Sequence, residues 1–207
     1  MDLHLPGGPV RSLKDFFVHI GVVTLSILIA LGLGQIVDAH HRANLAKIAV
    51  VGFRKELLYD EGQVKNVLAR VPELQSKIET AIAKLSAPTP ATAEGPINYP
   101  GISLDIVSTA SWDTAIATQA LTELPFEAVT RYAQAYGTLR LFAETQRDGL
   151  SVWQGVRRFG TDPRALTQDQ RVALIQELRR YGNVMTVIEF AGRGALESCV
   201  AALTAPK

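Results

Sequence analysis

The sequence predicts an all-α protein with one N-terminal transmembrane helix, a long heptad-like helix or hairpin, and a small helical bundle. Three observations support this class: an uncharged apolar block, apolar residues at helical spacing along most of the remaining chain, and no segment with the alternation of a β-strand. The predicted order is an N-terminal tail (1–15), a transmembrane helix (16–37), a juxtamembrane and coiled-coil-like segment (38–85), a Pro/Ala/Thr-rich loop (86–104) and a helical bundle (105–207) that packs with 43–85.

The composition of the 207 residues argues against several classes of function. Lys and Arg total 21 and Asp and Glu total 20, so the chain lacks the basic excess that neutralises nucleic-acid phosphates, and no nucleic-acid partner is expected. Cys199 is the only cysteine, which excludes an intrachain disulfide and a Cys-rich zinc site. Its apolar surroundings in the sequence predict a small buried hydrophobe. A catalytic thiol would need a His base, and all four His lie between positions 4 and 41, far from Cys199 in the chain.

The predicted transmembrane helix covers 22 residues without Asp, Glu, Lys or Arg, between Asp15 and Asp38. At about 1.5 Å per residue this stretch reaches roughly 33 Å, enough to cross a hydrocarbon core of about 30 Å. A cleaved signal peptide is the main alternative, because small residues surround Asp38 and basic residues precede the block. The block is longer than the roughly 7 to 15 apolar residues of a signal peptide, and a soluble core helix would show regular polar positions. A membrane span is therefore the prediction.

Ser26, Ala30 and Gly34 recur every four residues and form a candidate helix-association face within the span. Small residues on one side let a second helix approach closely, so a homo-oligomer or another protein is a candidate partner beside the lipid bilayer. Small residues are also common in any membrane helix, and this alternative stays open.

The orientation prediction depends on basic residues at the two ends of the span. Arg11 and Lys14 lie before it, and further basic residues follow it at Arg42 and Lys47. The short tail with two basic residues close to the span favours a cytoplasmic N-terminus, with the larger C-terminal domain outside the cytoplasm.

A heptad pattern follows the span. Apolar residues stand seven apart from Leu57 to Leu85, with further members three residues later, as in the a and d positions of a coiled coil. The candidate coiled-coil seam is Leu57, Val64, Val67, Val71, Leu74, Ile78 and Leu85. This stripe either packs within its own domain or pairs with a second chain. Pro72 interrupts the pattern, so the helix kinks there or stops and restarts.

The second half of the chain predicts further helices after the loop. They are expected over about 108–122, from Pro125 to about 147, over 150–159, and from a capping box at Thr167 and Gln170 to about 203. In the last helix, Gly192 and Gly194 each weaken the helix by about 1 kcal/mol relative to Ala.

No familiar catalytic motif is present, and no cofactor is expected. Asp105, Asp113 and Glu189 are the carboxylates worth testing as a catalytic group, although their spacing fixes no distance between them. Asp38 and His41 supply two metal ligands where a site needs at least three. The predicted catalytic, cofactor-binding and metal residues are therefore none, and an enzyme is not expected.

Several segments resemble uncharacterised bacterial single-pass membrane proteins, a domain-of-unknown-function type. The resemblance lies in the span over 26–32, in the Phe-Arg-Lys-Glu-Leu element over 53–57, and in the helices over 114–121 and 125–136. It covers about residues 16–145 and rests on motifs of low specificity. The resemblance implies a bacterial inner-membrane protein and no activity. The Pro/Ala/Thr-rich loop departs from the pattern, which leaves the placement of the two helical parts open.

Two functions fit these expectations. The first is a membrane-anchored helical interaction or scaffold module, supported by the span, the heptad stripe and the lack of a catalytic group of residues. The second is an extracytoplasmic ligand-sensing helical bundle without its own output domain, since bundle cores can hold small ligands. A pocket within the bundle would favour the second.

Overall fold

The computed structural model describes residues 13–87, 96, 97, 99, 101, 104–160 and 162–204. Within these residues the chain is helical and contains no β-strand, which confirms the predicted all-α class. The predicted tail up to residue 12 and most of the predicted loop over 86–104 lie outside the described residues.

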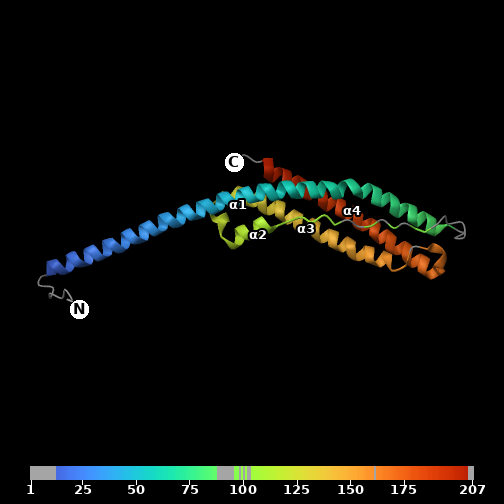
Figure 1. Cartoon of the computed structure of the whole chain (residues 1–207), viewed down its shortest axis with the longest axis horizontal. Helices are drawn as coiled ribbons and strands as arrows, with labels where there is room; N and C mark the ends of the chain where they lie inside the picture. Colours follow the sequence, from blue (N-terminus) through green and yellow to red (C-terminus); the bar gives the residue numbers. More distant parts are fainter. Residues whose placement is uncertain are drawn as a thin grey trace, which may run out of the picture.

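The elements in chain order are α1 (Leu13–Ser86), α2 (Ala110–Ala117), η2 (Ala120–Glu123), α3 (Phe126–Arg157), η3 (Pro163–Ala165) and α4 (Gln168–Thr204), where η denotes a 3₁₀ helix. The second half of α1 forms a bundle with α3 and α4, and α4 packs against both of the others. The first half of α1 extends away from this bundle as a single helix (Figure 1). The short elements α2 and η2 lie against α1 near the point where it leaves the bundle.

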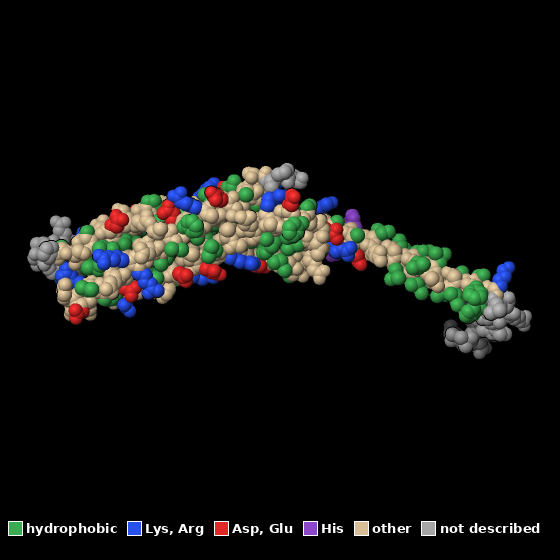
Figure 2. Space-filling model, turned by 180° about the vertical axis from the view of Figure 1, so that it is seen from behind, with side chains coloured by type: hydrophobic (Ala, Val, Ile, Leu, Met, Phe, Trp, Pro, Cys, Tyr) green, Lys and Arg blue, Asp and Glu red, His purple; other side chains and the backbone are tan. Residues whose placement is uncertain are grey.

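Helix α1 is one unbroken element of 74 residues. Its N-terminal part is long and apolar enough to cross a membrane, and none of its most apolar stretch is buried by the rest of the chain. Figure 2 shows these apolar side chains along the narrow arm of the molecule, while charged side chains gather on the bundle. One helix therefore contains both the candidate span and one wall of the bundle.

Pro72 neither ends nor restarts the helix, because α1 continues through it to Ser86. A proline inside a helix removes one backbone hydrogen bond and costs about 3 kcal/mol. Val71 and Ile78 on either side of it are almost fully buried, and their burial in the core offsets this cost. Packing of the surrounding residues thus outweighs the helix-breaking effect of Pro72.

Two predicted helix boundaries were wrong. The helix predicted over 108–122 is divided into α2 and η2, because Gln119 adopts a left-handed backbone conformation with φ of 57°. The two helices predicted over 125–147 and 150–159 are one element, α3, which runs through Gly149 without interruption. Gly149 is buried, so packing of the helix outweighs its low helix propensity.

The start of α4 matches the predicted capping box. The backbone N–H of Thr167 donates to Gln170 Oε1 at 2.9 Å, and the N–H of Gln170 donates to Thr167 Oγ1 at 3.3 Å. The C-terminal end of α1 also gains a hydrogen bond, because Arg171 of α4 donates to the backbone oxygen of Leu85 at 2.8 Å. One arginine therefore fastens α4 to the last turn of α1.

An ion pair places the other end of the bundle close to the candidate span. Arg42 Nε of α1 lies 3.0 Å from Glu123 Oε1 of η2. Arg42 comes five residues after Val37, the last residue of the uncharged stretch. The bundle therefore begins within about 8 Å, along the helix axis, of the end of that stretch.

Candidate functional site

The outer face of α1 is the side of this helix that points away from the bundle, and it is defined by Ile48, Val51, Leu58 and Tyr59. These apolar side chains are 60%, 67%, 59% and 59% exposed. Their neighbours Phe53 and Leu57, on the other side of the helix, are fully buried. Helix α1 is therefore apolar on two sides in this region, and the described part of the chain covers only one of them.

The outer face of α1 is aligned with the small-residue face predicted within the span. Two interleaved series of residues, each seven apart, connect the two faces: Ala30, Val37, Asn44, Val51 and Leu58, and Gly34, His41, Ile48, Lys55 and Gly62. Residues seven apart on an unbroken helix lie on nearly the same side, with a drift of about 20° per heptad. The aligned surface is about 40 Å long between Ala30 and Leu58.

Ser26, Ala30 and Gly34 all project from α1 without contact with the bundle. The Ser26 hydroxyl donates to the backbone oxygen of Val22 at 2.8 Å, so its polar group is satisfied within the helix. No heavy atom lies within 4 Å of the position that a Gly34 side chain would occupy. Their role in helix association stays a prediction.

The predicted coiled-coil seam faces the core of its own bundle. Six of its seven members are at most 7% exposed and the seventh is partly buried: Leu57, Val64, Val67, Val71, Ile78 and Leu85, followed by Leu74. The heptad pattern over 57–85 is therefore explained by contacts within the chain. On this part of α1, the outer face is the apolar surface that stays free for a partner.

Two neighbouring carboxylates, the partly buried Glu56 and the buried Asp60, lie where the segment that leads into α2 crosses α1. Glu56 accepts hydrogen bonds from Ser108 Oγ at 3.0 Å and from Ser111 N and Oγ, each at 3.1 Å to Oε2. Asp60, one turn later, accepts from the backbone N–H of Ser108 at 3.0 Å. Glu56 thereby satisfies the N-terminal turn of α2, and the two carboxylates hold residues 104–111 on α1.

Asp60 is the unusual member of this pair, because its side chain is fully buried. Its Oδ1 accepts from Ser108, whereas its Oδ2 receives no hydrogen bond from the described residues. Burial raises the Asp60 pKa to about 6, the hydrogen bond from Ser108 opposes this rise, and the charge of Glu56 adds to it. Ionisation of Asp60 near neutral pH therefore lowers the stability of the folded bundle.

The heptad pattern of the sequence carries a signal for Asp60. The positions Phe53, Asp60, Val67, Leu74 and Ala81 stand seven apart, so Asp60 occupies a core position of the heptad pattern. A carboxylate in a series of core residues is a conspicuous exception, since Asp is almost never fully buried without a partner. Glu56 had no such signal, because its partners come from a segment about 50 residues away in the sequence.

Four aromatic rings pack beside the carboxylates. The ring of Phe53 lies 5.6 Å from Trp112, 4.8 Å from Tyr132 and 5.8 Å from Tyr136 between centroids. Burial, together with the charges of Glu56 and Asp60, raises the Tyr136 pKa well above its usual range. The aromatic residues Tyr132 and Tyr136 of α3 are thus part of the core at this point.

A second polar contact holds the same segment to α3. The side-chain amide of Gln146, which is buried, accepts from the backbone N–H of Asp105 at 3.2 Å and donates to the Asp105 oxygen at 3.3 Å. Arg70 of α1 forms an ion pair with the Asp105 carboxylate. Residues 104–111 are therefore fixed at one end by Asp105 and at the other by Glu56 and Asp60.

The three carboxylates considered as a catalytic group are each paired with a different arginine. Asp105 pairs with Arg70, Asp113 with Arg140, and Glu189 with Arg193. They lie on different parts of the chain and do not meet in one cleft. Among the described residues there is also no group of three or more His, Cys, Asp or Glu able to hold a metal ion, and this range includes Asp38 and His41.

Cys199 is buried in the core, which confirms the prediction of a small buried hydrophobe. Burial raises its pKa to about 12, with smaller contributions from the charges of Asp60 and Glu61. A thiol in this state is protonated at neutral pH and is a poor nucleophile.

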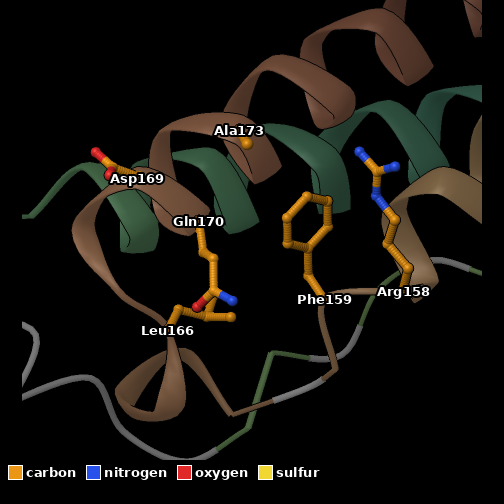
Figure 3. Close-up of a pocket in the computed structure, with 6 residues that line it drawn as sticks. All are labelled: Arg158, Phe159, Leu166, Asp169, Gln170 and Ala173. Carbon is orange, nitrogen blue, oxygen red and sulfur yellow. The ribbon is translucent and has the colours of Figure 1, made fainter.

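One hollow in the described part of the molecule lies at the end of the bundle farthest from the candidate span. It has a volume of about 530 Å³ and is lined by Arg158, Phe159, Leu166, Asp169, Gln170 and Ala173. Figure 3 shows the ring of Phe159 between Gln170 and Arg158. Arg158 already pairs with Glu177 at 3.3 Å, so its guanidinium is engaged outside the hollow.

Comparison of the chain with protein-family models, with curated proteins and with solved structures finds no match. The candidate site therefore rests on the geometry described above.

Proposed function

We propose that this chain is a membrane-anchored helical interaction module whose partner binds along the outer face of α1. The observation that supports this function best is the continuity of α1, which joins the candidate span to an exposed apolar face without a break. Soluble proteins rarely expose several large apolar side chains together on one side of a helix unless another molecule covers them. In this proposal α1 is both the anchor and the binding element.

The partner that fits this surface is a helix parallel to α1, contributed by a second copy or by another membrane protein. Small residues at Ala30 and Gly34 permit close approach within the bilayer, and Val51 and Leu58 continue the contact outside it. Beyond Gly62 the same side of α1 becomes polar, so the contact ends there. Lys55 is the charged member of the face, and polar residues at such positions set the register of paired helices.

The placement in the cell completes the proposal. The span crosses a bacterial inner membrane with the N-terminus in the cytoplasm, as Arg11 and Lys14 favour, and the bundle lies in the periplasm. A ligand-sensing bundle receives less support, because the hollow of about 530 Å³ lies at the far end of the bundle and gathers no group of residues typical of a ligand site. An interaction module requires no pocket.

Membrane attachment is tested by washing membranes that contain the full chain with alkaline carbonate. The chain is expected to stay in the membrane pellet, because the uncharged helix is inserted in the hydrocarbon core. Release of the intact chain into the wash would rule out an inserted anchor.

The outer face of α1 is tested by cysteine crosslinking in the same membranes. Single variants Val51→Cys and Leu58→Cys probe the outer face, and Thr80→Cys is a matched control because it is an exposed position on the polar part of the same helix. The native Cys199 can stay, since it is buried. We expect Val51→Cys and Leu58→Cys to form covalent adducts with a partner chain and Thr80→Cys to form few. Equal crosslinking at all three positions would contradict the proposal.

A further inference from the structure

The carboxylates of Glu56 and Asp60 differ in how their oxygens are satisfied, and the interaction face does not explain this difference. Glu56 accepts four hydrogen bonds, two from Ser108 and Ser111 hydroxyls and two from the Ser111 N–H, which is shared between its two oxygens. Asp60 accepts one hydrogen bond and leaves Oδ2 buried without a donor. A buried carboxylate oxygen without a donor loses the hydration that it has in water, and this loss favours the neutral acid.

The groups that face Asp60 do not compensate its charge. Glu56 lies one turn earlier on α1, Ser108 belongs to the crossing segment, Tyr136 comes from α3, and Cys199 comes from α4. Apart from Ser108, each of them is acidic or is a neutral group that becomes negative on ionisation. Among the described residues no ion pair includes Asp60 or Glu56.

Three cations of the bundle are engaged in other ion pairs. Lys65 pairs with Glu61, Arg70 with Asp105, and Arg140 with Asp113. These three cations would have to break an ion pair to reach Asp60, whereas a proton needs no such rearrangement.

We propose that Asp60 is a proton-binding site, and that a proton bound there fastens residues 104–111 to α1. The proton removes the repulsion between Asp60 and Glu56 and supplies a donor at the oxygen that lacks one. When the segment lifts from α1, Asp60 meets water and its carboxylate is hydrated. Closure of the segment and uptake of a proton are thus linked, and a rise in pH loosens the segment.

The direction of this pH dependence follows from the pKa of Asp60 in the closed and in the open state of the segment. Asp60 titrates at about 6 when the segment covers it and near the usual value of about 4 when the segment is open. Opening therefore becomes easier as pH rises from about 4 to about 6, and it changes little above pH 7. The site lies within the bundle and is independent of which partner binds the outer face of α1.

Hydrogen exchange of the full chain in lipid nanodiscs tests this linkage. The exchange rate of peptides that cover 104–111 is measured for the unaltered chain and for Asp60→Asn at pH 4 and pH 7. The intrinsic exchange chemistry cancels in the ratio of the two rates, because residue 60 lies outside these peptides. We expect this ratio to rise at least tenfold between pH 4 and pH 7, with about 100-fold as the limit for a difference of two pKa units.

A ratio that changes by less than about twofold over this range overturns the proposal. If Asp60→Asn does not fold, the carboxyl carbon of Asp60 is titrated by NMR in the unaltered chain. A midpoint near 6 supports the site, and a midpoint near the usual value of about 4 overturns it.

Discussion

At the residue scale, Asp60 shows how one side chain can depart from the pattern that surrounds it. It stands in the heptad series of core residues and is fully buried, yet its partner is a backbone N–H from a distant segment. Hydrophobic periodicity finds such positions because it marks the buried side of a helix. It does not identify the hydrogen-bond donor, because Ser108 is distant in the sequence and meets Asp60 only in the folded bundle.

The raised pKa of Asp60 predicts how the stability of the whole bundle depends on pH. The folded state binds the proton of Asp60 more tightly than the unfolded state, so the contribution of Asp60 to stability is fully present below pH 4 and is lost as pH rises through about 6. The Asp60 contribution amounts to at most about 3 kcal/mol for a shift of two pKa units. Thermal unfolding followed by circular dichroism is expected to show this fall in the unaltered chain but not in Asp60→Asn. Parallel pH profiles for the two proteins would refute the prediction.

At the element scale, the helices themselves were largely predictable, whereas their ends and continuity were not. The capping box at Thr167 and Gln170 is a local signal, and it correctly marked the start of α4. Pro72 and Gly149 are local signals too, but packing against the bundle outweighs them and the helices continue. The outer face of α1 was missed because exposure of an apolar residue depends on where the other helices lie.

Gly192 and Gly194 in α4 are alike in sequence and different in packing. A Cβ at Gly192 would lie 2.9 Å from Leu68 Cδ2 and 3.1 Å from Phe142 Cε2, whereas nothing lies within 4 Å of one at Gly194. Gly192→Val is expected to lower the free energy of unfolding by about 1–3 kcal/mol through overpacking. Gly194→Val is the matched control and should be neutral or slightly stabilising, because Val has the higher helix propensity.

Thermal unfolding of both glycine variants in the same detergent gives the comparison. A difference of about 1 kcal/mol corresponds to roughly 2–4 °C in the midpoint for a chain of this size. Equal midpoints would show that α4 does not approach α1 and α3 as closely at Gly192 as described.

At the scale of the whole molecule, α1 combines a candidate span, a wall of the core and an exposed apolar face in one helix. The bundle begins within a few residues of the candidate span, where Arg42 pairs with Glu123. A change in the packing of one α1 helix against a partner would therefore reach the bundle without a flexible linker between them. This continuity is the central claim about the molecule.

A crosslinking scan with single cysteines at every position from 26 to 62, in membranes, tests this claim most directly. If α1 is unbroken and a partner binds its outer face, crosslinking should peak at about every 3.5 residues, with maxima near 30, 34, 48, 51 and 58 in one phase. Positions 53 and 57 face the core and should stay unreactive. A change of phase between the span and residue 48, or crosslinking without periodicity, would contradict the account.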